Sequence, residues 1–334
     1  MTSHKKNRGA ALLMAMLTVT LVATFAAAAM WQQWRGVEVE QAERARVQSG
    51  WILTGALDWA RLILTEDGKV RTESADYLSE PWAVPLQEAK LSTFLAAERG
   101  VATVASGDDS PEAFLSGEII DLQSKLNVRN LLDGDGRKIS PRGRLSFTRL
   151  FETLGLPPAQ LANLAENLRF AADNSADNRS GPMAPLMPQR VDQLVWLGLA
   201  PETVAALQPY VTLLERPTPV NLNTASAEVI FASVDGLSMA DAQRLVAERD
   251  RSHFRSLVDA SKVVSSVDPE VFKTDQVSVQ SSYFESRGRL RLGTITVEER
   301  SVIKRTGNPT SVKALLRERG VVDSASPGMP LPAR

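Results

Sequence analysis

The chain has 334 residues, of which 43% are hydrophobic and 23% charged, with two histidines, no cysteine and a formal net charge of −1. This composition is ordinary for a folded protein and excludes a largely disordered chain. The absence of cysteine excludes disulfides, thiolate metal sites and a cysteine nucleophile, and the near-zero charge provides no strong field for nucleic acid.

The N-terminal segment predicts a membrane anchor. Residues 1–9 are basic, and residues 10–34 carry no charge until they end at Trp34. Twenty-five helical residues reach about 37 Å, which exceeds the roughly 30 Å of a bilayer core. Trp31 and Trp34 stand where interfacial aromatic residues are common.

A cleaved secretory signal is the alternative for this segment, since Ala27, Ala28 and Ala29 resemble a signal-peptidase site. The apolar stretch is long for a signal, and its helical pattern continues without a polar break to Ile63. We therefore expect one helix over 10–64, with 10–34 spanning the membrane. The basic leader then stays in the cytoplasm, which places the rest of the chain in the periplasm.

Residues 65–140 have a mixed pattern. We expect a helix near 86–98, a strand-like run over 117–128 and a turn at 133–136, where the sequence is Asp-Gly-Asp-Gly.

Residues 141–272 predict three helical hairpins. Gly155, Gly198 and Gly236 each follow a helical stretch and can adopt positive φ, and a new helix starts two or three residues later. Ser238 and Asp241 form a plausible capping pair for the last of these helices.

Residues 273–320 change to an alternating pattern typical of an antiparallel sheet, with a bulge expected at Gly293. Residues 321–334 are rich in proline and predict a loose tail. The fold class is therefore α+β.

Three motifs carry a resemblance to a known family: Arg8-Gly9 before the apolar helix, the run 121–131 (DLQSKLNVRNL) and the run 219–229 (PVNLNTASAEV). In this order they resemble the minor pseudopilin K family of type II secretion, also called general secretion pathway protein K. The resemblance implies a leader, residues 1–9, that a prepilin peptidase removes between Gly9 and Ala10. It also implies a pilin-type head built from 65–140 and 273–320, with an all-α domain of the helix-hairpin-helix or SAM-like kind, 141–272, inserted into it.

The functional expectations also follow from this resemblance. Pilin-type proteins usually carry glutamate at the fifth mature position, which is Met14 here, and the K subunits are the exception. The family sits at the tip of the pseudopilus with the minor pseudopilins I and J, is anchored in the bacterial inner membrane and initiates or caps the filament for protein export across the outer membrane. We expect no catalytic residues and no enzymatic activity, because no nucleophile–base pair, phosphate loop or metal cluster appears in the sequence.

A membrane-anchored periplasmic DNA-binding protein is the alternative function, because the hairpin at 221–238 resembles a helix-hairpin-helix motif. Residues 221–262 carry five Lys or Arg and six Asp or Glu, whereas phosphate binding requires a basic face. We therefore expect a structural hairpin and no nucleic-acid partner.

No cofactor is certain from the sequence, and calcium is the candidate that the family resemblance suggests. Asp173 and Asp177 lie where a calcium-binding loop of the helical insert is expected, but this loop is less acidic than the family pattern. In the turn 133–136, Arg137 stands where a third oxygen ligand is wanted. Two solvated turns are the alternative interpretation of both segments.

Overall fold

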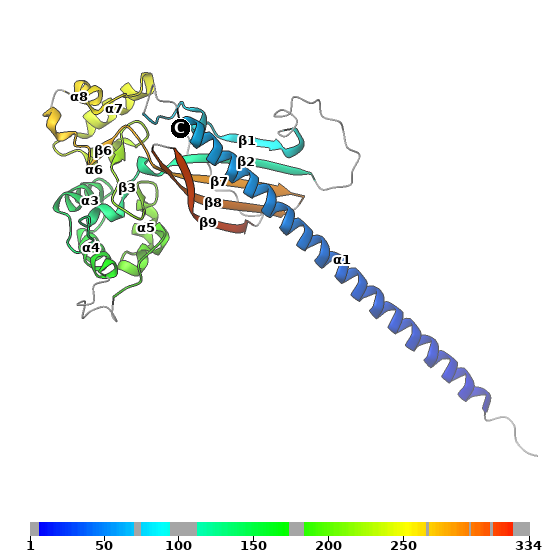
Figure 1. Cartoon of the computed structure of the whole chain (residues 1–334). Coiled ribbons are helices and arrows are strands. Elements are labelled where there is room, and N and C mark those ends of the chain that lie inside the picture. Colours follow the sequence, from blue (N-terminus) through cyan, green and yellow to red (C-terminus); the bar gives the residue numbers. More distant parts are fainter. Residues whose placement is uncertain are drawn as a thin grey trace, which may run out of the picture.

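A computed structural model of the chain describes residues 7–69, 75–93, 112–173, 184–264, 267–293, 295–307 and 310–322. These residues form one long helix, a five-stranded antiparallel sheet and a group of shorter helices (Figure 1). The α+β class that the sequence predicts is confirmed.

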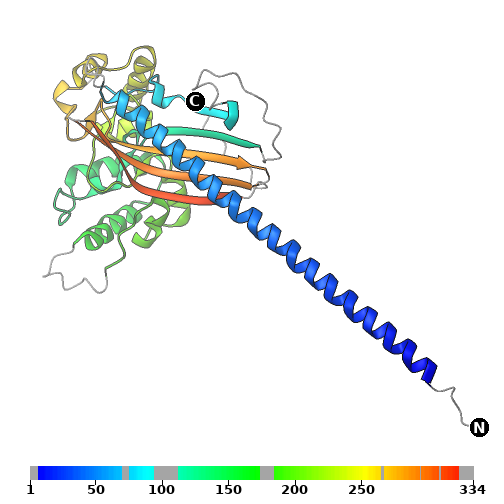
Figure 2. The same ribbon diagram turned by 45° about the vertical axis from the view of Figure 1, so that its right-hand side comes forward.

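The long helix α1, Asn7–Asp67, confirms the predicted N-terminal helix, and at 61 residues it is about 90 Å long. Its N-terminal part is exposed, and its fully buried side chains occur only near its C-terminal end, at Ser49, Leu53, Leu57, Ala60 and Leu64. These positions share one helix face, so α1 packs on the sheet over its last turns only. In two views 45° apart, α1 crosses the sheet and continues well beyond it (Figures 1 and 2).

The sheet has the strand order β1-β2-β7-β8-β9, and every neighbouring pair is antiparallel. Its strands are β1 Leu86–Lys90, β2 Ala113–Asp121, β7 Tyr283–Leu292, β8 Ile295–Thr306 and β9 Ser311–Val322. The 3-10 turn η1, Pro81–Ala83, precedes β1 and buries Trp82 between α1 and the sheet. The sheet therefore combines two strands from before the group of shorter helices, β1 and β2, with three strands from after it, β7, β8 and β9.

Two local predictions in the sheet are wrong. The predicted helix at 86–98 begins instead as strand β1, because pairing with β2 outweighs a weak local preference for helix. Gly293, predicted as a bulge, lies in the tight turn between β7 and β8 with φ 59°, a conformation that favours glycine.

The helical region lies between β2 and β7 in the chain. Its longer elements are α3 Pro141–Thr153, α4 Pro158–Ala172, α5 Pro201–Leu207, α6 Ala227–Ser233, α7 Met239–Arg251 and α8 Leu257–Val263. Its shorter ones are η2 Leu122–Ser124, β3 Leu126–Asn127, η3 Val128–Leu131, η5 Val191–Leu197, β4 Val211–Thr212, β5 Val220–Asn221, η6 Pro269–Val271 and β6 Val277–Ser278. Two pairs of short parallel strands, β3 with β4 and β5 with β6, connect its parts.

The helical region is larger than the predicted insert, 141–272. Leu126 and Leu131 before it, and Val277 after it, are buried in the same apolar cluster as Phe147 of α3. The strand predicted over 117–128 likewise ends at Asp121. The sheet therefore meets the helical region at Asp121 and again just before β7, rather than at residues 140 and 273.

The turn chemistry predicted for the helical hairpins is confirmed. Gly155, Gly198 and Gly236 have φ of 65°, 91° and 73°. Ser238 caps α7, since its Oγ accepts a hydrogen bond from the Asp241 backbone N at 3.1 Å and donates to the Asp241 carboxylate at 2.6 Å.

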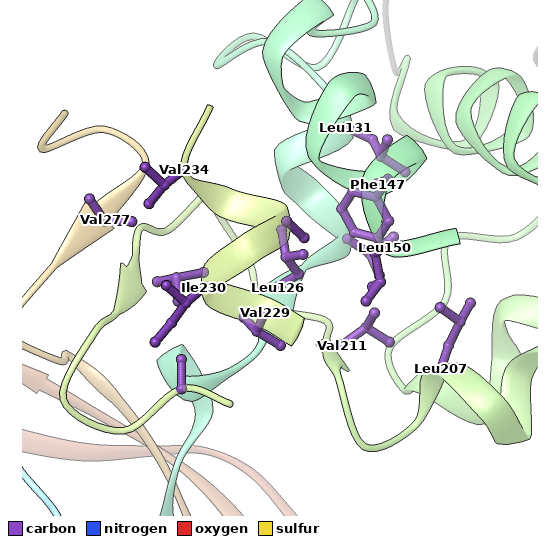
Figure 3. Packing of buried hydrophobic residues seen from close by; sticks show 14 of the residues in the cluster. Leu126, Leu131, Phe147, Leu150, Leu207, Val211, Val229, Ile230, Val234 and Val277 are labelled. Carbon is purple, nitrogen blue, oxygen red and sulfur yellow. The ribbon is translucent and has the colours of Figure 1, made fainter. Parts of the chain in front are cut away.

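One continuous apolar core fills the helical region (Figure 3). It includes Phe147 and Leu150 of α3, Val229 and Ile230 on α6, and Leu207 of α5. The size of this cluster shows that the helical region has a core of its own, separate from the smaller clusters under α1.

Candidate functional site

A buried polar junction fastens the helical region to the sheet at the end of β2. The carboxylate of Asp121, 3% exposed, accepts hydrogen bonds from the Gln123 backbone N at 2.7 Å and the Asn221 Nδ2 at 3.1 Å. It also accepts from the hydroxyls of Thr224 and Ser281, both at 2.6 Å. Four donors from three separate segments of the chain therefore converge on one carboxylate.

Asn221 is the central amide of this junction and is 0% exposed. Its Nδ2 lies 3.1 Å from the carbonyl oxygen of Asp76, in addition to its contact with Asp121. Its Oδ1 accepts from the backbone N of Asn223 at 3.0 Å. One side chain thus connects β5 of the helical region with the segment that follows α1 and with the end of β2.

Burial raises the pKa of the Asp121 carboxyl, while the hydrogen bonds from Ser281 and Thr224 act in the opposite direction. All of these partners are donors that hold the group in place. The junction is therefore a structural network of satisfied polar groups, the kind that specifies a single packing arrangement.

Two further asparagines bind the segment that leads to β5. Asn127 donates to the carbonyl of Arg216 at 2.6 Å and accepts from the backbone N of Leu214 at 3.2 Å. Asn130 bonds to the backbone N and carbonyl of Thr218 at 3.0 and 2.8 Å. The run 121–131, noticed in the sequence only as a motif, thus contacts the run 219–229 through Asp121 and the residues just before that run through Asn127 and Asn130.

Two arginines beside the α6–α7 hairpin bind its backbone carbonyls. Arg249 of α7 has a side chain that is 7% exposed and donates to the carbonyl of Leu222 at 2.7 Å and to that of Ala225. Arg149 of α3 donates to the carbonyl of Leu237 at 2.7 Å. These arginines brace the hairpin from inside, which favours the structural interpretation of this motif over phosphate binding.

A second polar cluster, at the C-terminal end of α1, was not predicted. Asp67, Asp76 and Glu80 place carboxylate oxygens within 4.8 Å of one another. Arg305 of β8 forms ion pairs with Asp67 and Asp76, and it donates to the carbonyl of Ser281 at 3.0 Å. The cluster ties α1 to the sheet beside the polar junction, and we call it the α1 cap cluster.

The α1 cap cluster retains one proton at neutral pH, on Glu80. Burial raises the pKa of Glu80 to about 8, although its Oε2 accepts from the Tyr77 backbone N at 2.9 Å and from Trp82 Nε1 at 2.7 Å. Burial also raises the pKa of Asp76 to about 6, against the opposing effect of Arg305. One guanidinium cannot compensate three carboxylates, so the cluster retains a proton rather than a third charge.

The sequence contains no local signal for this cluster. Asp76 and Arg305 are 229 positions apart, and neither belongs to a recognisable motif. Only the packing of β8 beside the end of α1 brings them together.

Those predicted processing and metal residues that the structure describes belong to neither polar network. Ala10 and Met14 are exposed at the N-terminal end of α1, where Met14 is 74% exposed, and Gly9 lies in the first turn. Asp173 follows α4, and Asp177 falls outside the described residues.

The turn at 133–136 has the geometry of an ordinary loop. The Gly136 backbone N donates to the Asp133 carbonyl at 2.8 Å, and the Asp135 carboxylate accepts from the Arg137 backbone N at 3.0 Å. The solvated-turn interpretation therefore fits this segment.

The exposed part of α1 fits a membrane span by length and composition. Its most apolar 18-residue window has a mean hydropathy of 2.2 and is 0% buried. An apolar helix without protein cover is stable only where another hydrophobic environment surrounds it.

Solved and curated proteins resemble the chain over nearly its whole length. The structure of the GspK-GspI-GspJ complex from the enterotoxigenic Escherichia coli type 2 secretion system matches with a TM-score of 0.63 and 20% identity, covering 84% of this chain and 98% of that one. The type II secretion system protein K of Pseudomonas aeruginosa is 26% identical over 99% of this chain and 96% of its own length.

Models of one protein family match the helical region directly. Both are described as type II secretion system (T2SS), protein K, and they match residues 124–217 and 220–280. Their ranges contain Asn127, Asn130 and Asn221 and the whole α6–α7 hairpin. The chain therefore belongs to the type II secretion system protein K family and is a minor pseudopilin of that system.

Proposed function

We propose that this minor pseudopilin occupies the tip of the pseudopilus and starts its assembly, with the minor pseudopilins I and J as its partners. In this proposal α1 is anchored in the bacterial inner membrane, the sheet and helical region lie in the periplasm, and the chain carries out no catalytic step. The related GspK of E. coli forms a complex with GspI and GspJ, which supports the choice of partners.

The single observation that carries the proposal is the placement of the helical region relative to α1. The exposed N-terminal half of α1 offers a surface along which other subunits can pack, and the helical region widens the head near the other end of α1 (Figures 1 and 2). Other subunits can therefore add beside α1 and on its membrane side. The broad head leaves little room for a subunit on the side away from the membrane.

Co-purification tests this function. Full-length protein co-expressed with the I and J subunits of the same bacterium, extracted in mild detergent, should retain both partners through size-exclusion chromatography. Recovery of the chain without either partner would contradict the tip proposal.

Processing at the leader is a separate prediction. In cells that contain a prepilin peptidase, the mature protein should begin at Ala10, and N-terminal sequencing or intact mass measures this directly. Without the peptidase, the leader should remain. A mature terminus at Met30 would instead show that the helix is a removed signal, and the anchored subunit would be excluded.

The residue Met14 is consistent with a subunit that starts the filament. A carboxylate in the bilayer centre is costly unless a partner charge neutralises it, so an apolar residue is preferred where no partner amine is available. This account rests on the family resemblance and is tested by the effect of Met14→Glu on assembly, with Met14→Leu as the control.

Calcium binding by Asp173 and Asp177 stays a prediction of the sequence. If the site binds calcium, about 1 mM CaCl₂ should raise the thermal midpoint of the full chain relative to a chelator, and Asp173→Asn should remove the increase. An unchanged midpoint would support two solvated turns instead.

A further inference from the structure

An apolar groove of about 300 Å³ lies between α1 and the β1 side of the sheet. Ile52, Trp59 and Ile63 of α1 form one wall, and Leu86 and Leu115 on the strands form the other. We call this feature the α1 groove. It lies at the part of α1 that packs on the sheet, beside the apolar clusters that join them.

Gly55 opens the α1 groove toward solvent. It lies inside α1, where glycine costs about 1 kcal/mol relative to alanine, and its φ is not positive. A Cβ at this position would meet no atom within 4 Å, whereas one at Gly117 would lie 2.9 Å from the Arg287 carbonyl. Packing within the chain therefore explains why position 117 is glycine, but it does not explain the glycine at position 55.

Exposed apolar side chains surround the α1 groove. Trp51 is 74% exposed, Val84 63% and Leu62 56%. Val84 lines the groove, and Trp51 and Leu62 lie within two turns of Gly55 on α1, so exposed apolar side chains accompany the groove, as they do at protein-binding sites.

We propose that the α1 groove receives the N-terminal helix of a neighbouring minor pseudopilin, and this inference rests on the proposed function. A volume of about 300 Å³ accommodates only a few side chains, such as those at positions i, i+3 and i+7 of a helix. That contact alone is too small for a stable interface, so its occupant must also contact other surfaces.

The exposed half of α1 supplies that additional surface. Ile52 is 18 residues beyond Trp34, so the groove begins about 27 Å along the helix from the end of the uncharged segment. A second helix rising from the same membrane beside α1 reaches this height and meets the groove at Gly55, where the missing side chain allows close backbone approach.

Two other occupants fit the surface less well. An added strand would pair with the backbone at the sheet edge formed by β1, outside the groove. The helix of a second copy would present its outward face, on which Asp58 lies between Trp51 and Leu62; the Asp58 side chain is 60% exposed and pairs with Arg61. Burying that carboxylate in an apolar groove is unfavourable.

The variant Gly55→Leu tests the inference because it adds apolar bulk at the groove, at a position where a Cβ meets no atom of the chain within 4 Å. It should fold at least as well as the wild type, since leucine is the better helix former. We expect about tenfold weaker retention of the partner subunits in the co-purification assay. Gly134→Leu is the matched control, because a Cβ at Gly134 also meets no atom within 4 Å, but this glycine lies in the turn 133–136 of the helical region, outside both α1 and the groove.

The outcomes separate the inference from the function on which it rests. If the wild type retains no partner, the proposed function fails. If the wild type and Gly55→Leu retain partners equally, or if Gly134→Leu weakens retention as much, the groove inference is overturned while the function stands. A photo-crosslinker in place of Val84 should label the N-terminal helix of a partner subunit, and labelling of a second copy of this chain would overturn the choice of occupant.

Discussion

Replacing Asn221 by leucine should lower the free energy of unfolding by about 3 kcal/mol. The side chains are similar in size, so the change removes hydrogen bonds rather than volume. It deprives Asp121 of one donor and leaves the carbonyl of Asp76 and the backbone N of Asn223 without their partner in a site that is 0% exposed at Asn221. For a domain of this size the thermal midpoint should fall by about 6 °C or more.

Thermal unfolding of the full chain in detergent, followed by tryptophan fluorescence, measures this effect. Asn163→Leu is the matched control, since Asn163 is exposed on α4 and should change the midpoint by no more than about 1 °C. Equal midpoints for Asn221→Leu and the wild type would show that the junction contributes little to holding the helical region on the sheet.

The stability of the head should fall as the pH rises toward 8, because of the α1 cap cluster. Glu80 has a pKa of about 8 in the folded protein against an ordinary value of 4.5, and Asp76 about 6 against 3.8, in both cases chiefly because of burial. The folded state therefore holds these protons more tightly than the unfolded state. Stability from Glu80 is fully present below about pH 4.5, falls as the pH rises and levels off above about pH 8.

The variant Glu80→Gln isolates this effect, because glutamine reproduces the protonated carboxyl and its oxygen can still accept from Tyr77 N and Trp82 Nε1. At about pH 5 the variant and the wild type should have similar thermal midpoints. At about pH 8.5 the variant should be the more stable by about 2 kcal/mol, after allowance for solvent screening of this partly exposed group.

A constant difference between Glu80→Gln and the wild type across this pH range would contradict the assignment. The comparison removes the contribution of titrating groups outside the α1 cap cluster. The charges of Asp67 and Asp76 help to raise the pKa of Glu80, so they are part of the measured effect. Lysine at position 80 is unsuitable as a control, because it would add a cation to a cluster that already contains Arg305.

The elements that could be predicted are those whose signals are local. The uncharged segment and its helical continuation predicted α1, because apolar periodicity over many residues is a strong signal. The glycines at 155, 198 and 236 predicted helix ends, since positive φ strongly favours glycine. The cap at Ser238 was equally local, requiring only a residue three positions away.

The predictions that failed concern segments whose conformation depends on distant partners. Residues 86–90 form a strand because β2 lies beside them, and the strand over 117–128 stops at Asp121 because its carboxylate binds Asn221, Thr224 and Ser281. The local sequence pattern contains no signal for the pairing with β2 or for the hydrogen bonds to Asp121.

The functional features likewise fall into those that the sequence could predict and those that depend on the folded structure. The order of the motifs was sufficient to indicate the family, because an anchor, a leader and asparagine-rich runs can be recognised along the chain without knowing their contacts. The polar junction, the α1 cap cluster and the α1 groove exist only after folding, since each combines residues separated by more than a hundred positions. Burial raises the proton affinity of the Glu80 carboxyl, and the packing of α1 on the sheet leaves Gly55 uncovered. Both properties come from the surroundings of these residues in the folded protein rather than from the residue types themselves.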